Sequence, residues 1–284
     1  MKKNFKKSKF VILPALATLV LTGVASVTGT VTWFTANRAV SVTTGNFTAY
    51  DESRGLEIKA TAVAGVTIGD NNVVTPSGVL TDASFDFSNV WTDVPNTENE
   101  GEAPTEFVKA TTPFKSGSKD ESSNEVYYAM QWTYTIGLVN KNGELAKSID
   151  VLFDESSSFN VTTTTGTTTA NGFRIAMVSG ENKFVFSNGN EKKHIGEKTD
   201  EATKGEEMTW ADADYITATP GYSKLADGVD HKNANEYLGT ITNSSDTISI
   251  ACTAWYEGTD SSVISNNAMS TVGATLKFYS RNAA

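Results

Sequence analysis

"EVYYAMQWTYTIGLV", residues 125–139, decides the fold class of this chain. Every second residue from Val126 to Leu138 is large and apolar, and the positions between them are mostly small or polar. A period of two is that of a β-strand with one buried face, whereas an amphipathic helix needs a period near 3.6 residues. The stretch therefore predicts a long strand whose apolar face covers a core.

The same alternation recurs in "DTISIACTAWYEG" (246–258) and "TVGATLKFYS" (271–280). Shorter stretches rich in Val, Ile, Thr and aromatic residues also favour strands; they are 56–68, 84–91, 148–153, 172–178, 183–187 and 237–242. Many short strands with turn residues between them indicate two sheets packed face to face. We predict an all-β fold, a jelly-roll-like antiparallel β-sandwich formed by residues 34–284 as a single domain.

Segments poor in apolar residues separate these strands. Residues 95–123 and 187–236 are polar and predict long loop excursions, because they bury too little apolar surface to offset their ordering entropy. The threonine-rich 161–172 is either an exposed strand pair or a mobile tip. Only 197–216 and 261–270 offer a turn or two of helix, and neither carries a sustained apolar stripe.

The N-terminus has the pattern of an export signal. Five lysines precede Phe10, and no charged residue follows until after Phe34. We interpret residues 1–33 as a cleaved signal peptide, with a retained membrane anchor as the alternative. The cut falls between Ala25 and the residue after Trp33. The mature chain is then secreted, and it meets the membrane only through the leader before cleavage.

Charge and cysteine content limit the partners. Loss of the five leader lysines changes the net charge from −10 to −15. An acidic chain lacks the basic footprint that nucleic acid requires, so we expect no nucleic-acid partner. Cys252 is the sole cysteine, so no internal disulfide forms in this exported chain. It lies on the apolar face of its strand, where a thiol is a small core residue.

No catalytic motif is present, and we expect neither enzymatic activity nor a cofactor or metal. His194 and His231 are the only histidines, lack metal-ligand spacing, and are interpreted as solvated loop residues. Two features leave weaker alternatives open. The pairs Asp82/Asp86 and Asp212/Asp214 offer calcium ligands, and exposed tryptophans, namely Trp91, Trp210 and Trp255, offer a carbohydrate platform.

Three stretches together resemble a known family: the leader with "TWFTANRAVSVTTGNFTAY" (32–50), "YYAMQWTYTIGLVNKNGELAKSIDVLF" (127–153) and "YLGTITNSSDTISIACTAWYEGTD" (237–260). They are similar to the TasA and camelysin-like secreted proteins of Gram-positive bacteria. The resemblance implies a jelly roll, leader removal by a signal peptidase, and assembly into extracellular matrix (biofilm) fibres by donor-strand exchange. In such exchange, the N-terminal strand of one subunit completes the sheet of the next.

Residues 34–50 are the segment on which this mechanism would depend, as an N-terminal arm or donor strand. Val40 and Val42 share one face, Gly45 permits a bulge, and Phe47 and Ala49 continue beyond it. With Phe34, these residues are the predicted self-assembly set. The alternative is a plain first strand that pairs within its own domain.

We therefore expect a structural subunit whose partner is a second copy of itself, with other matrix or surface proteins as further partners. The alternative function is a monomeric surface-associated β-sandwich that binds glycan or another cell-surface protein.

Overall fold

A computed structural model describes residues 41–51, 55–93, 106–112, 114–120, 122–139, 145, 147–163, 171–218, 236–260 and 270–283. For residues 41–51 the description covers the backbone and its pairing. The leader, the arm residues Phe34 and Val40, and His231 lie outside the described residues, as does the possible helix at 261–269. Within these ranges the chain is all β, with two single-turn 3-10 segments, η2 (Asp70–Asn72) and η3 (Asp212–Asp214).

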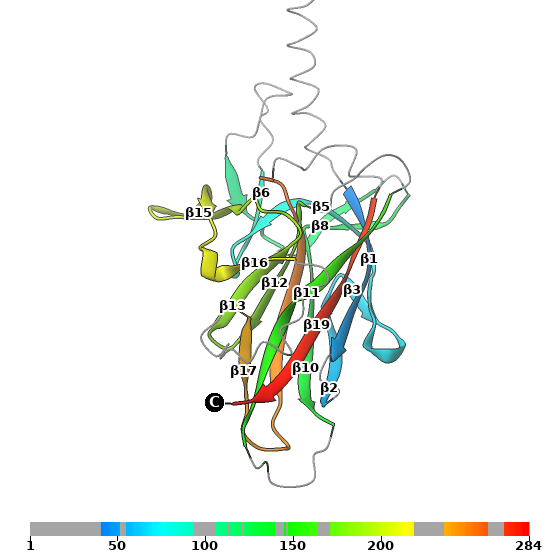
Figure 1. Ribbon diagram of the computed structural model, residues 1–284. Helices are drawn as coiled ribbons and strands as arrows, with labels where there is room; N and C mark the ends of the chain where they lie inside the picture. The colour runs from blue at the N-terminus through cyan, green and yellow to red at the C-terminus, as the bar shows by residue number, and fades with distance from the viewer. Residues whose placement is uncertain are drawn as a thin grey trace, which may run out of the picture.

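Two sheets form the predicted sandwich (Figure 1). The first, sheet A, contains β1 (Ser41–Asp51), β3 (Val66–Ile68), β4 (Val74–Pro76), part of β5 (Val79–Phe85), β8 (Lys115–Lys119), β9 (Glu125–Tyr127), β11 (Ile149–Thr163), β17 (Tyr237–Ile241) and β19 (Ser270–Asn282). The second, sheet B, contains β2 (Leu56–Ala64), β10 (Ala129–Leu138), β12 (Phe173–Ser179), β13 (Asn182–Ser187), β16 (Tyr215–Thr217) and β18 (Ile248–Glu257).

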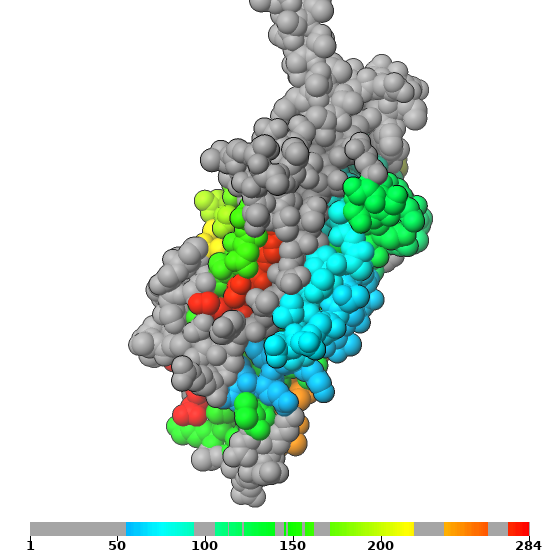
Figure 2. Space-filling view, turned by 90° about the vertical axis from the view of Figure 1, so that its right-hand side faces the viewer, coloured from blue at the N-terminus to red at the C-terminus, as the bar shows by residue number. Residues whose placement is uncertain are grey.

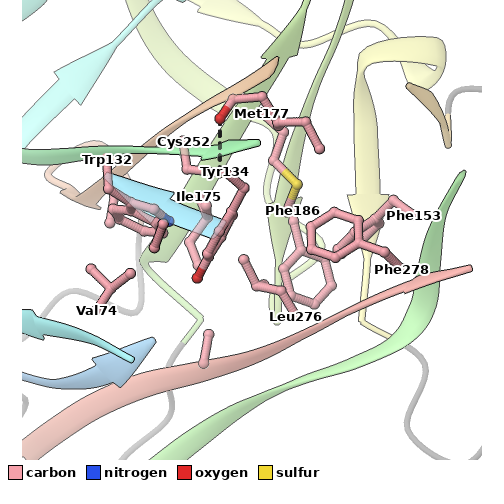
Figure 3. Close-up of a cluster of buried hydrophobic side chains, with 14 of the residues drawn as sticks. Val74, Trp132, Tyr134, Phe153, Ile175, Met177, Phe186, Cys252, Leu276 and Phe278 are labelled. Atoms are coloured by element: carbon pink, nitrogen blue, oxygen red, sulfur yellow. Dashed lines mark hydrogen bonds between the residues drawn. The ribbon is translucent and has the colours of Figure 1, made fainter. Parts of the chain in front are cut away.

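The main core lies between these two sheets, as the alternating pattern predicts. Figure 3 shows Trp132 and Tyr134 of β10, Met177 of β12 and Cys252 of β18 on the side of sheet B. Opposite them, sheet A contributes further buried side chains, among them Phe153, Leu276 and Phe278. Interdigitated aromatic rings fill much of this space; the Tyr134 and Phe278 rings, for example, meet edge to face at 6.0 Å.

A third, smaller sheet was not predicted. Sheet C combines the end of β5 with β6 (Val90–Asp93), β7 (Phe107–Lys109), β14 (Lys193–Lys198) and β15 (Glu201–Thr209). A second apolar cluster lies where it meets sheet B, and includes Phe85, Val90, Ala176, Val185 and Trp255. Thus Ala176 of β12 and Trp255 of β18, which lie between core positions, are buried as well, on the opposite face of sheet B.

β5 connects the three sheets. Its first residues pair with β1, Asp82 and Ala83 pair in parallel with β18, and Ser84 and Phe85 pair with β6. β14, the last strand of sheet C in pairing order, also contacts β5, because the Ile195 N–H donates to Ser84 Oγ at 2.7 Å.

Three sequence predictions need correction. The supposed excursions 95–123 and 187–236 contain strands β7, β8, β14, β15 and β16. Of the helical turns expected at 197–216, only the single 3-10 turn η3 is present, because β15 takes up the middle of the segment and pairs with both β14 and β7. Backbone pairing with strands distant in the sequence, such as that of β15 with β7, supplies the stabilisation that the polar segment lacks locally. The sandwich is also not purely antiparallel: the pairs β1–β19, β5–β9, β5–β18 and β13–β16 are parallel.

Candidate self-assembly strand

β1 occupies a central position in sheet A. Along one edge it runs parallel to the C-terminal strand β19, from Thr43 opposite Thr271 to Asp51 opposite Phe278. Along the other edge, residues 41–43 pair antiparallel with β5, and Phe47 pairs with Val74 of β4. The N-terminal strand therefore joins two halves of the sheet, β17–β11–β19 on one side and β4 with β5 on the other.

A bulge divides β1 at the position predicted from Gly45. The register with β19 shifts between Thr44 and Phe47, so two residues of β1, Gly45 and Asn46, lie opposite one residue of β19, Gly273. A shift of one residue exchanges the faces of a strand. Before the bulge, the even-numbered Thr44 is in register with Val272. After it, the odd-numbered Phe47 is in register with Ala274, and both residues of β19 belong to the main core.

Three of the five predicted self-assembly residues lie in this strand. Val42 is in register with Leu80, Phe47 with Val74 and Ala274, and Ala49 with Leu276. The four neighbours named here are fully buried members of the main core. The slot that holds β1 is therefore apolar on its core side.

The link between β1 and β2 is short. β1 ends at Asp51 in sheet A and β2 begins at Leu56 in sheet B, which leaves residues 52–55 to connect the two sheets. The five residue steps from Asp51 to Leu56 reach roughly 17 Å when extended, and packed sheets are about 10 Å apart, so this short connection is long enough to cross between the two sheets.

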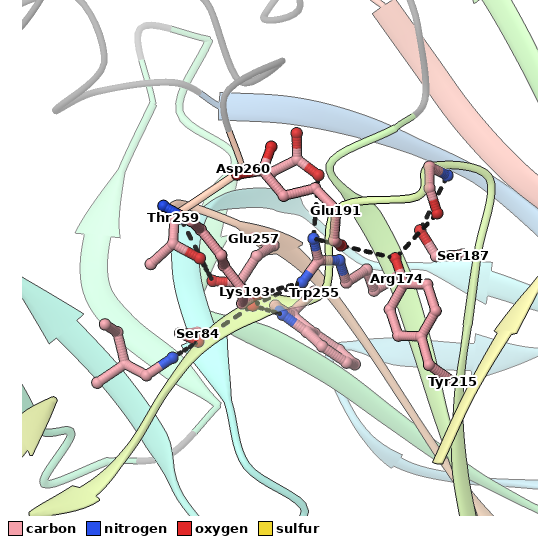
Figure 4. A network of polar contacts seen from close by, with 12 residues as sticks. Ser84, Arg174, Ser187, Glu191, Lys193, Tyr215, Trp255, Glu257, Thr259 and Asp260 are labelled. Atoms are coloured by element: carbon pink, nitrogen blue, oxygen red, sulfur yellow. Dashed lines mark hydrogen bonds and ion pairs between the residues drawn. The ribbon is translucent and has the colours of Figure 1, made fainter. Parts of the chain in front are cut away.

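A buried ionic network lies at another position, between sheets B and C (Figure 4). Arg174 of β12 is fully buried and bonds to the backbone carbonyls of Glu191 and Lys193 and to Asp260 Oδ2. Its Nη1 also lies 3.4 Å from Glu257 Oε2. The guanidinium thus ties β12 to the end of β18 and to the segment before β14.

Glu257 is held from several sides. Ser84 Oγ and Trp255 Nε1 donate to one carboxylate oxygen, and the backbone N–H and hydroxyl of Thr259 donate to the other. Burial raises the pKa of Glu257, and Arg174 and these donors oppose that rise. Because the network is enclosed, we interpret it as structural. No sequence motif identifies it, since Ser84 and Arg174 are far along the chain from Glu257 and Asp260.

His194 is not a solvated loop residue, which corrects its sequence interpretation. It lies in β14, is 5% exposed, and stacks on Trp210 with ring centroids 3.7 Å apart. Burial lowers the pKa of His194 to about 4; Asp86 partly opposes this shift. The imidazole therefore fills space against Trp210, a member of the second apolar cluster.

The three tryptophans do not form a carbohydrate platform. Trp91 and Trp255 are fully buried, and Trp210 is 7% exposed. Cys252 is also fully buried, as predicted. The acidic pairs have other roles: Asp86 accepts bonds from the Ser88 and Asn89 backbone and from Trp91 Nε1, and Asp212 pairs with Lys192. In the described parts of the chain, no three potential metal ligands cluster together.

Comparisons with family models, with curated proteins and with solved structures each return no match for this chain. Within the ranges that the structure covers, no helix is both long and apolar enough to cross a membrane.

Proposed function

We propose that this chain is a secreted structural subunit of extracellular matrix fibres, which assembles when β1 of one copy enters sheet A of the next. The observation that carries the proposal is the central position of β1, with a neighbouring strand on each side. When such a strand leaves, it opens one slot with two unpaired edges, and the slot accepts only a strand of the same pattern.

The exchange costs little at equilibrium. A β1 strand that moves from its own subunit to a neighbour regains the same backbone bonds and the same apolar contacts, as in domain swapping. Protein concentration then decides the balance between closed monomer and polymer.

A cysteine pair across β1 and β5 tests the proposal. Ser41 is in register with Thr81, which is half-buried and near the end of the slot. In a Cys252→Ala chain that begins at residue 34, Ser41→Cys with Thr81→Cys should oxidise to a closed monomer. That monomer should polymerise only after reduction. Oxidation of preformed fibres should instead give covalent multimers on a non-reducing gel. Fibres in which the disulfide stays within one chain would contradict strand exchange.

Two matched charge variants test the slot itself. Val42 is in register with the fully buried Leu80, whereas Ser41 is in register with the half-buried Thr81. An unpaired carboxylate is costly in an apolar slot, so Val42→Asp should reduce filament yield far more than Ser41→Asp. A synthetic peptide of residues 34–51 should block assembly. Equal yields for the two variants, measured by sedimentation and electron microscopy, would refute this role of the slot. Retention of the monomer on a glycan array would favour the alternative function.

A further inference from the structure

β2 has an open edge on the surface of the molecule. It pairs with β10 along one side, and among the described strands no other pairs with it. Figure 2 shows the segment that begins with β2, blue to cyan, at the surface of the face turned to the viewer. Glu57, Lys59 and Thr61 are exposed, and Val63 is 54% exposed. An accessible edge of this kind is a template for pairing with another chain.

One side chain occupies the middle of this edge. The Ala60 N–H donates to Asn72 Oδ1 at 3.1 Å, and Asn72 Nδ2 donates to the Ile58 carbonyl at 3.0 Å. A single residue of a parallel neighbouring strand would bond to residues 58 and 60 in the same way. The carboxamide thus satisfies two backbone groups that an incoming strand needs.

The loop that presents Asn72 is built for this contact. Asn71 and Asn72 both have positive φ, 57° and 58°, a region that Asn tolerates better than most residues. The turn is closed by the Gly69 N–H, which donates to the Val73 carbonyl at 2.9 Å. Asn71 is exposed and Asn72 is half-buried, so two adjacent asparagines of similar φ differ in their contact with β2.

We propose that Asn72 is an edge plug that prevents β2 from pairing with β2 of a second copy of this chain. Charge favours a second copy as the excluded partner. In an antiparallel pair centred on Ile58, Glu57 of each copy lies opposite Lys59 of the other, which gives two complementary cross-strand pairs. The plug acts on a different edge from the β1 slot, and the inference does not depend on strand exchange.

The test compares Asn72→Gly with Asn71→Gly, since glycine suits the positive φ at both positions. In Asn72→Gly, the Ala60 amide should exchange with solvent at least about tenfold faster in the monomer at low concentration. Analytical ultracentrifugation should show dimers at higher concentration. Asn71→Gly should match the parent chain in both measurements.

A charge change identifies the dimer interface. Adding Lys59→Glu to Asn72→Gly places Glu57 opposite a second carboxylate, so the dimer should dissociate. Asn72→Gly that remains monomeric with a slowly exchanging Ala60 amide would overturn the proposal. Dimers of Asn71→Gly would also overturn it, because they would indicate an effect of the loop. Dimers that persist after Lys59→Glu is added would overturn it as well, because they would indicate another interface.

Discussion

Arg174 Nη1 lies 3.4 Å from Glu257 Oε2, and both side chains are completely buried. This pair connects two strands of sheet B at the level where sheet C covers them. A buried pair of this kind adds little net stability compared with apolar residues, but removal of one partner leaves an uncompensated charge.

Replacement of Arg174 by Met should therefore destabilise the fold by about 3–5 kcal/mol. The Glu257 and Asp260 carboxylates would stay buried without their cation, and two backbone carbonyls would lose their donor. Chemical denaturation measures the change. Lys192→Met is the control, because it removes a surface pair with Asp212 and a cation–π contact with Tyr215 and should change little. Equal effects of the two variants would contradict the structural role of the network.

His194 should make the fold sensitive to acid. Its folded-state pKa of about 4 lies below the ordinary value of 6.5, so the unfolded chain takes up a proton there that the folded chain does not. Stability should fall as the pH drops from 6.5 to 4, by on the order of 3 kcal/mol. His194→Phe keeps a ring over Trp210 and cannot titrate. Its stability should therefore fall by correspondingly less than that of the parent between pH 6.5 and 4. Parallel pH profiles for the parent and the variant would rule out this effect.

Asp82 should have the opposite pH dependence. Removal from water and the nearby Asp93 carboxylate raise the pKa of Asp82 to about 7. Between pH 3.8 and 7 the Asp82 carboxyl is protonated in the folded chain but ionised in the unfolded chain. Its contribution to stability is therefore fully present below pH 3.8 and is lost as the pH rises through 7. In thermal melts, the stability of Asp82→Asn relative to the parent should increase as the pH rises from 3.8 to 7. Asp212→Asn is the control, because Lys192 lowers the pKa of the Asp212 carboxyl. A gain that does not depend on pH would refute the assignment.

Cys252 should be unreactive in the native state. It is fully buried in the main core, and burial raises the pKa of its thiol. A thiol reagent should label it only at the rate of unfolding. The control is Ser249→Cys in a Cys252→Ala chain, because position 249 lies on the same strand but is exposed. That thiol should react quickly in native buffer, and fast labelling of Cys252 itself would show that the strand faces are misassigned.

The sequence by itself determined the fold class and the main core. In β10 and β18 a period of two places Trp132, Tyr134, Ile250 and Cys252 on the inner face, and a side chain's face in a strand follows from local geometry alone. The bulge in β1 was predictable for the same reason, since Gly45 interrupts the alternation.

Only the tertiary structure decided the third layer and its contacts. β14 and β15 are too polar to predict as part of a core; β14 buries His194 and Ile195, whereas the mostly exposed β15 is held by backbone pairing with β14 and β7. His194, Trp255 and Arg174 are buried by residues far away in the chain, so no local pattern identifies them. The partners of β1 were undetermined for a related reason. A strand's edges pair through backbone groups that every sequence shares, and only the arrangement of β19, β4 and β5 places β1 between them.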